Sequence, residues 1–385
     1  MTVTVNYRSF RVINYRAMDS RHNASKEYAN LSLQTVYAYA IILVNSKTEV
    51  GVSEKHLDVL VVGDVLTDAF VKLLDDQAWT SEGENGLVLS MPFGMKVPFD
   101  HSEVVYGVGN SSNAAVSLTR LGINTGLVAN IGSDDGGRDI LRAYHEHGID
   151  TRFVHVNHGK RSNFHYVLWY KDDRTILINH EHYEYQWPRF KSHDVPKWMY
   201  LTSIGANTLE YHDEIAEFLE EHPDVRLMFQ PGTFQISSGA ERLARLYRRT
   251  EVVVLNREEA VLVTGGNHDD MHDLINRMHT LGPRVVAISD GPNGAYVSDG
   301  ENRFKMPLYP DPAPPLERTG AGDAFASTLL AGLYHGLSLE DAVRWAPINS
   351  MNVVQFVGAQ KGLLTTEQLM ELLRSAPEWY HPERF

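Results

Sequence analysis

Short apolar runs recur along this chain with helix-forming stretches between them, and this alternation constrains the fold more than any other feature. The first run covers residues 57–63 (LDVLVVG) and ends at Gly63. A strand that is apolar on both sides is typical of a parallel sheet with helices on both faces. The sequence predicts further strands at residues 126–131, 198–202, 225–229, 252–255 and 285–289, each with a helical stretch before it. The alternation predicts an α/β fold of three layers, helix–sheet–helix, with a mostly parallel central sheet.

Two segments interrupt the alternation and predict antiparallel strands. Residues 75–101 are rich in turn residues and contain only short apolar runs. Residues 164–169 and 174–178 are two strand-like runs separated by a Lys-Asp-Asp turn. Both patterns are typical of hairpins. We therefore predict lid insertions near residues 83–106 and 160–182 that form a small β-sheet on a body of residues 56–375, with a C-terminal tail at 376–385.

The first 55 residues lack this alternation and are predicted to form an N-terminal extension. It is either an appendage packed on the body or a segment without chemistry of its own. The apolar run at residues 36–44 is too short for a transmembrane helix and lies too far from the start for a simple secretory signal. We therefore expect no membrane contact and a cytoplasmic location.

Charge and cysteine content exclude several classes of function. A formal net charge of −14 disfavours binding to nucleic acid or anionic membranes. The chain has no cysteine, which excludes disulfides, thiolate nucleophiles and cysteine-based zinc sites. Its eighteen histidines include no HExxH spacing, and no GxxxxGKS, GxxxxGKT or GxSxG sequence is present. A zinc protease, a P-loop nucleotidase and a hydrolase with a nucleophile elbow are thereby disfavoured.

The segment at residues 316–330 (LERTGAGDAFASTLL) carries the strongest chemical signal. A turn of Gly320, Ala321 and Gly322 leads through Asp323 into an apolar helical pattern. The first turn of a helix has free backbone N–H groups that attract an anion. A carboxylate beside a bound phosphoryl group can take the proton of an attacking hydroxyl. The segment is interpreted as an anion cradle with a general base, and the alternative is an ordinary Asp cap after a glycine turn.

Weaker candidates lie at other strand ends. Asp64 and Asp68 follow the first strand, where one of them is placed to bind substrate hydroxyls, and each is alternatively a helix cap. Residues 106–115 form a glycine turn that brings the backbone close to a ligand, with Asn113 in the following helical turn. The other candidates are Asn256 with Glu259, as a Mg²⁺ site or a helix cap, and the glycine turn at residues 289–295, as a nucleotide contact or a plain hairpin.

Taken in order, these motifs resemble those of the ribokinase-like (PfkB) family of carbohydrate and nucleoside kinases over about residues 57–364. The most specific match is the family's D-T/A-x-G-A-G-D signature at residues 317–323. The resemblance implies that Asp323 is the catalytic base and that Gly320, Ala321 and Gly322 form the anion hole. It implies nucleotide contacts from Thr319, Asn256, Ser289, Gly291 and Gly294. It further implies a Mg²⁺–phosphate role for Glu259 and acceptor contacts from Asp68, Gly109 and Asn113.

The match has departures. Val108 replaces a glycine of the acceptor motif, Glu317 and Arg318 replace the usual Asp and small residue, and Gln230 stands where many members have Asp. The implied function is transfer of a phosphoryl group from ATP, with Mg²⁺, to a sugar hydroxyl. A nucleoside is an alternative acceptor, since Phe164, Tyr166 and Trp169 offer rings for a base, and packing within the hairpin is the other reading of those rings. A non-catalytic binding protein is a third reading. The exposed lid strands are candidates for pairing into a homodimer.

Overall fold

A ten-stranded sheet forms the centre of the protein. The computed structural model describes residues 56–84, 86–171 and 173–385, so the predictions for residues 1–55 lie outside it. Seven neighbouring strands of the large sheet are parallel and three more extend one edge in antiparallel fashion. In spatial order they are β16 (Glu383–Arg384), β15 (Arg303–Met306), β14 (Ala295–Ser298), β13 (Val285–Ser289), β12 (Thr250–Asn256), β11 (Arg226–Phe229), β10 (Trp198–Leu201), β1 (Val59–Val62), β6 (Thr125–Gly132) and β7 (Asp150–Asn157). The predicted mostly parallel sheet is confirmed.

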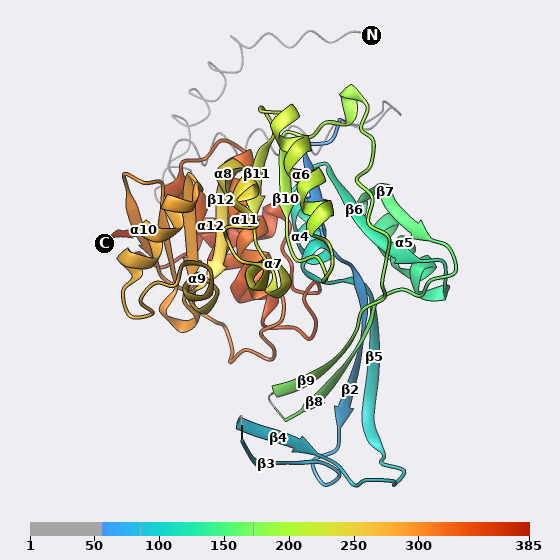
Figure 1. Cartoon of the computed structure of the whole chain (residues 1–385). Helices are drawn as coiled ribbons and strands as arrows, with labels where there is room; N and C mark the ends of the chain where they lie inside the picture. The colour runs from blue at the N-terminus through green and yellow to red at the C-terminus, as the bar shows by residue number, and fades with distance from the viewer. Residues whose placement is uncertain (1–55, 85, 172) are drawn as a thin grey trace, which may run out of the picture.

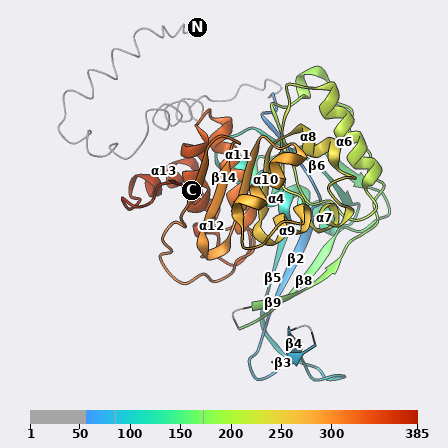
Figure 2. The same ribbon diagram turned by 60° about the vertical axis from the view of Figure 1, so that its left-hand side comes forward.

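Helices cover both faces of this sheet, as the apolar strands require (Figures 1 and 2). Side chains of β1 alternate between the faces: Val59 and Val61 pack into one apolar cluster, and Leu60 and Val62 into the other. The first cluster is covered by α4 (Asn110–Arg120), α5 (Asp135–His147), α11 (Ala321–Tyr334), α12 (Leu339–Val353) and α13 (Thr366–Arg374). The second is covered by α6 (Leu209–Glu221), α8 (Ala244–Arg249), α9 (Arg257–Thr264) and α10 (Met271–Leu281), with the short α7 (Thr233–Ser238) nearby. The three-layer prediction is confirmed.

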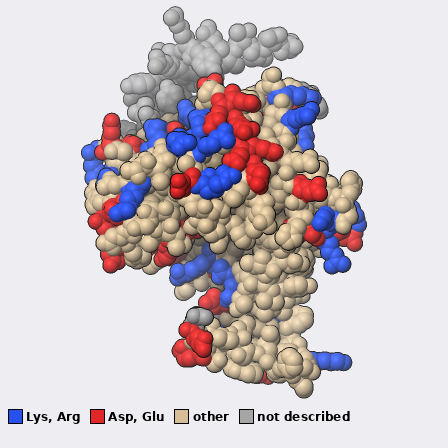
Figure 3. Space-filling model, in the orientation of Figure 1, with Lys and Arg blue, Asp and Glu red and all other residues tan. Residues whose placement is uncertain are grey.

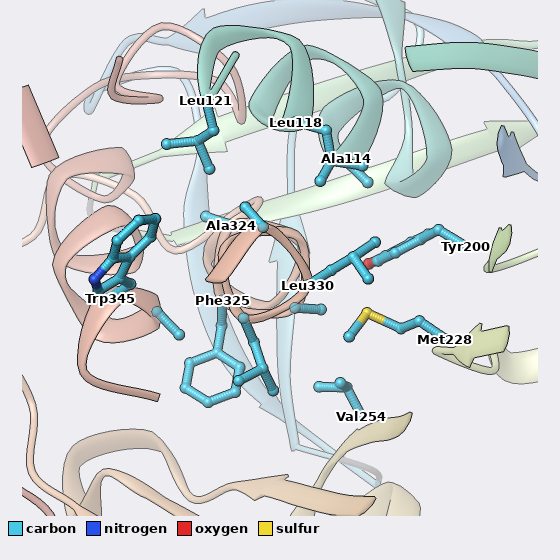
Figure 4. Packing of buried hydrophobic residues seen from close by; sticks show 14 of the residues in the cluster. Ala114, Leu118, Leu121, Tyr200, Met228, Val254, Ala324, Phe325, Leu330 and Trp345 are labelled. Carbon is cyan, nitrogen blue, oxygen red and sulfur yellow. The ribbon is translucent and has the colours of Figure 1, made fainter. Parts of the chain in front are cut away.

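Helix α11 occupies the centre of the first cluster (Figure 4). Its residues Ala324, Phe325 and Leu330 are buried, and it is apolar on nearly every side. A helix that is hydrophobic all round is stable only when surrounded by other elements. Around it lie Ala114 and Leu118 of α4 with Leu121 just after that helix, Tyr200, Met228 and Val254 of the sheet and Trp345 of α12. This packing fixes the position of the residues at the start of α11.

A second, four-stranded sheet projects from the body and forms the lid (Figure 1). Its order is β5 (Phe99–Val108), β2 (Leu66–Leu73), β8 (Phe164–Tyr170) and β9 (Asp173–Asn179), and a hairpin of β3 (Trp79–Gly83) and β4 (Gly86–Ser90) lies at its far end. The predicted antiparallel strands are present. The lid sheet begins earlier than residue 83, however, because β2 crosses into it directly after β1.

Two local expectations differ from the structure. No α-helix precedes β10 within the described residues 180–197, where a single 3₁₀ turn (Ser192–Asp194) lies instead. The chain reaches this strand from the lid, so no crossover helix is needed. The segment 376–385 packs on the body: β16 pairs with β15, and buried Tyr380 donates a hydrogen bond to the carbonyl of Arg344. No described helix is long and apolar enough to span a bilayer.

Candidate active site

The loop before α11 has a backbone that only glycine tolerates at its last position. Gly320 caps the helix in the left-handed region with φ of 82°. A Cβ at this residue would lie 2.5 Å from the Cβ of Ala359, so a side chain is excluded by contact as well as by conformation. The turn places Gly320 and Gly322 beside a cleft at the carboxyl edge of the sheet. Ala321 donates a long 3.4 Å hydrogen bond to the Arg318 carbonyl, which leaves its amide only weakly engaged.

Asp323 lies in the first turn of α11, and its side chain is held by three amides. Its carboxylate accepts hydrogen bonds from Asn113 at 2.8 Å, Asn110 at 3.1 Å and Gln230 at 3.5 Å. Only 6% of Asp323 is exposed, and burial raises its pKa to about 7, with the three amides opposing that rise and Glu259 adding to it. A carboxyl group with this pKa is suited to accept a proton near neutral pH.

These residues face a cleft of about 370 Å³ at the carboxyl edge of the sheet. The size is in the range of small-ligand sites. The cleft brings together most of the residues singled out in the sequence: Asp68, Gly109, Asn113, Asn256, Glu259, Ser289, Thr319, Gly320, Gly322 and Asp323. It is not lined by Ala321, Gly291 or Gly294. The roles of all these residues stay predictions, but most of them do share one site.

At one end of the cleft, Asn256 and Glu259 cap α9. The Asn256 side chain accepts from the Glu259 N–H at 2.8 Å, and the Glu259 carboxylate accepts from the Asn256 N–H at 2.8 Å. Burial raises the pKa of Glu259. The described residues contain no cluster of three metal-ligating side chains. A single carboxylate fits a Mg²⁺ ion that keeps most of its water and binds chiefly to phosphates, rather than a metal held by protein ligands alone.

A half-buried ion pair connects this end to the glycine turn after β13. Arg257, the first residue of α9, lies 2.7 Å from the Asp290 carboxylate. Gly291 and Gly294 have positive φ, and a Cβ at Gly294 would lie 2.2 Å from the Met306 carbonyl oxygen. The turn is therefore held tightly between α9 and β15. Sequence reasoning missed this pair, because nothing in the sequence shows that Arg257 and Asp290 are neighbours.

At the other end, the lid contributes Asp68 from β2 and His165 from β8. Their strands pair in parallel with these two residues opposite one another, and His165 Nδ1 lies 3.6 Å from the Asp68 carboxylate. Burial, together with the nearby Glu317, raises the pKa of Asp68 to about 7. The other aspartate, Asp64, is engaged by the Tyr185 hydroxyl and the Gly205 N–H, both at 2.7 Å, so it ties the end of β1 to a loop. Neither aspartate is a helix cap.

Four site residues were not predicted as such. Asn110 precedes Asn113 by one turn and donates a hydrogen bond to Asp323. Gln230 donates to the same carboxylate from the position just after β11, and Gln360 donates to Oδ1 of the Asn113 side chain at 3.1 Å. His165 is the fourth. The sequence offered two signals for these residues. Gln230 stands where many family members have Asp, and the alternation of the lid strands places His165 on one face of its strand. Asn113 uses its amide to hold Asp323, which leaves one N–H for a ligand.

The lid aromatics do not line the cleft, although Trp169 lies on the same face of β8 as His165. Phe164 and Tyr166 contact each other with ring centroids 5.0 Å apart and lie on the opposite face of β8 from His165. Trp169 lies farther along, where Lys72 Nζ is 4.1 Å from its ring. Packing within the lid therefore accounts for these rings.

Comparison with known proteins shows the family and the fold. The model of the pfkB family carbohydrate kinases matches residues 93–366. An uncharacterised sugar kinase of Archaeoglobus fulgidus is 26% identical over 252 residues, covering 64% of this chain and 98% of its own. An ATP-dependent 6-phosphofructokinase of Thermoanaerobacterium thermosaccharolyticum is 23% identical over 333 residues, covering 82% and 94%. The Arabidopsis thaliana ribokinase, solved with ribose and ATP, shares the fold with a TM-score of 0.67 and 18% identity, over 83% of this chain and 99% of that one.

Proposed function

The chain belongs to the pfkB family of carbohydrate kinases, and we propose that it moves the γ-phosphoryl group of Mg-ATP to a hydroxyl of a small sugar. Asp323 is the general base of this proposal. The observation that carries it is a buried carboxyl group with a pKa of about 7, facing the cleft from the first turn of a helix. Such a group can take a proton beside the helix N-terminus, where free N–H groups would stabilise a phosphoryl group.

The chemical step requires only proton transfer and stabilisation of charge from the protein. As Asp323 takes the hydroxyl proton, the acceptor oxygen bonds to the γ-phosphorus, and the bond from that phosphorus to the bridging oxygen of ADP breaks. The amides of Asn110 and Asn113 keep the carboxylate in place for this transfer. The N–H groups of Gly320, Ala321 and Gly322 would stabilise the charge on the transferred group.

The nucleotide would lie toward the end of the cleft formed by Asn256, Glu259, Ser289 and Thr319. Thr319 has a buried hydroxyl without a hydrogen-bond partner, which leaves it free to donate to a phosphate. Mg²⁺ would be oriented by Glu259 through water, and when bound it supplies neutralisation of the phosphate charge. Gly291 and Gly294 shape the turn beside this end without lining it.

The lid would close over the acceptor and exclude water, which otherwise competes for the phosphoryl group. Its outer face carries an apolar row across four strands: Leu177 of β9 opposes Tyr166 of β8, which opposes Ala69 of β2, which opposes Val104 of β5. In Figure 3 the projecting lid is mostly uncharged, with an acidic group at one side of its far end. An exposed apolar face of this kind supports the expectation of a homodimer formed through the lid.

Two other acceptors follow from the family. One relative is a 6-phosphofructokinase, so a phosphorylated sugar is a candidate alongside a free sugar. A nucleoside is the other, but none of the lid rings offered for a base lines the cleft. A non-catalytic binding role is disfavoured, since a scaffold has no need of a carboxyl group tuned to accept protons.

The test is coupled release of ADP from Mg-ATP with a panel of sugars, sugar phosphates and nucleosides. Replacing Asp323→Asn keeps the shape of the base but removes its proton affinity, so turnover should fall by about 10²–10⁴-fold. Binding of ATP, measured by calorimetry, should persist in the same variant. Near-normal turnover of Asp323→Asn would refute the assignment of the base.

A further inference from the structure

Gln230 connects the central sheet to the start of α11. It is the first residue after β11, and its backbone N–H donates to the Leu201 carbonyl at 2.9 Å, which continues the pairing of β10 with β11. Its side chain is half-buried and lines the cleft. The sheet therefore fixes the backbone of Gln230, and the contacts of its side chain decide where the amide points.

Tyr200 of β10 binds the carbonyl oxygen of this amide. Its side chain is fully buried in the apolar cluster around α11, and in Figure 4 its hydroxyl points toward that helix. The hydroxyl donates a hydrogen bond to Gln230 Oε1. Burial, together with the nearby Asp323, raises the pKa of Tyr200 well above its ordinary value, so the hydroxyl keeps its proton and stays a donor. Because the tyrosine hydroxyl binds Oε1, the amide nitrogen points away from it.

The amide nitrogen of Gln230 faces the start of α11. It donates to Asp323 Oδ1 at 3.5 Å, and a Cβ placed on Gly322 would lie 3.7 Å from it. A side-chain amide nitrogen carries two N–H groups. Among the residues that the structure describes, Asp323 provides its one hydrogen-bond acceptor. The second N–H is therefore free at the cleft, beside the proposed anion hole.

A neutral donor fits the charges of the cleft. The described residues that line it include Asp68, Glu259 and Asp323 but no lysine or arginine. On this lining, the protein donors available to the charge of a phosphoryl group are neutral. Side-chain amides serve as such donors in oxyanion holes, alongside backbone N–H groups. A carboxylate at position 230 would instead face Asp323 and repel it.

We propose that Gln230 is a catalytic residue whose amide donates one hydrogen bond to Asp323 and the other to the transferred phosphoryl group, and that Tyr200 is the positioning residue that orients this amide. The inference rests on the proposed phosphoryl transfer. It adds a side-chain donor to the backbone N–H groups of the anion hole. One amide thereby contacts both the base and the transferred group, which fixes their relative position.

The first test measures binding without turnover. Aluminium fluoride bound with Mg-ADP mimics the transferred phosphoryl group, and calorimetry gives the affinity of the full chain for Mg-ADP with and without it. The wild type should bind Mg-ADP about tenfold or more tightly when aluminium fluoride is present. Gln230→Met keeps the length of the side chain without a donor, so it should lose most of this gain and bind Mg-ADP alone as the wild type does. A gain that Gln230→Met retains, or that the wild type lacks, overturns the proposal.

The second test measures ADP release across pH. Gln230→Met should lower kcat by about 10–100-fold with little change in either KM, because the donor acts on the transferred group. Tyr200→Phe frees the amide to rotate and should lower kcat by about threefold to tenfold. It should also move the acid limb to higher pH by about half a unit, since the hydrogen bond from Gln230 lowers the pKa of Asp323. In the Gln230→Met background, Tyr200→Phe should have no further effect on kcat, and losses that multiply would overturn the positioning role of Tyr200.

Tyr380→Phe is the matched control, because it also removes a buried tyrosine hydroxyl that donates a hydrogen bond. Both Phe variants should lose stability in urea, but only Tyr200→Phe should change kcat and the pH profile. Equal changes in the two would assign the effect to stability and overturn the role of Tyr200.

The two tests separate this inference from the proposed function. A wild type that transfers to no acceptor, but shows a gain with aluminium fluoride that depends on Gln230, refutes the proposed function and supports the donor role of Gln230. A wild type that transfers, with kcat unchanged in Gln230→Met, supports the proposed function and overturns the inference.

Discussion

Arg174 on lid strand β9 forms an ion pair with Glu317 in the loop before α11, with 3.4 Å between Nε and Oε1. The other carboxylate oxygen of Glu317 accepts the Gly358 N–H at 2.8 Å. Glu317 thus contacts the lid on one side and the body on the other. The same loop leads into Gly320 and Asp323, so this ion pair connects the lid to the loop that carries the proposed anion hole. Glu317 is one of the departures from the family signature, where many members have Asp.

The first prediction concerns this pair. The substitutions Arg174→Gln and Glu317→Gln should each lower kcat/KM for the acceptor by about fivefold to tenfold, because each removes the ion pair between the lid and the loop before α11. The double variant should be little worse than either single one, giving a coupling energy of about 1 kcal/mol in a double-mutant cycle. Losses that simply multiply would mean that the two side chains act independently.

The second prediction concerns pH. If Asp323 is the base, kcat/KM should fall on the acid side with an apparent pKa near 7, since the protonated carboxyl cannot accept a proton. The hydrogen bond from Asn110 lowers this pKa, so Asn110→Ala should move the acid limb to higher pH by about half a unit to one unit.

Asp68 also has a pKa of about 7 and is the rival source of such a limb. The profile of Asp68→Asn separates them, because the limb should persist in that variant if it belongs to Asp323. Asn276→Ala, whose side chain contacts Arg303 on the surface, is the control and should leave the profile unchanged. An acid limb that disappears in Asp68→Asn would assign it to the lid aspartate.

The sequence predicted the layers and the location of the site because those depend on local patterns. Continuous apolar strands and the glycine turn before Asp323 each carry their own signal within a few residues. The features that the sequence did not predict depend on contacts between residues far apart in the chain. Asn110 and Gln230 reach Asp323 from positions 213 and 93 residues away, and β2 joins the lid only because of its pairing with β5 and β8. Likewise, nothing local distinguishes the inner His165 from the outer Tyr166.

The third prediction concerns the outer face of the lid. Tyr166 and Leu177 are each 51% exposed and Val104 is 45% exposed, which is unfavourable for a face left in water. We expect the full chain to sediment as a dimer at micromolar concentration, and Leu177→Lys to shift it toward the monomer. Trp379→Lys changes an exposed ring on the C-terminal segment and should leave the dimer intact. A wild-type chain that sediments as a monomer would contradict this role of the lid.

The last prediction links the base to stability. Burial raises the pKa of Asp323 from its ordinary 3.8 to about 7, so between these values the folded state binds more protons than the unfolded state. Stability is therefore lost as the pH rises from about 4 to 7 and stays lost above that. Asp323→Asn removes this penalty, and its free energy of unfolding in urea should exceed that of the wild type by about 1–2 kcal/mol at pH 8. The gap should close near pH 4.

A second aspartate provides the control of opposite sign. Hydrogen bonds from Ser162 and Gly137 hold the pKa of Asp134 below its ordinary value, so its charged form stabilises the folded state. Asp134→Asn should therefore lower the free energy of unfolding at pH 8, where Asp323→Asn raises it. If both substitutions destabilise the protein equally at pH 8, the hydrogen bonds to the Asp323 carboxylate stabilise the folded state by more than burial of that carboxylate destabilises it. In that case a proton affinity near neutrality would have to come from the bound substrates instead.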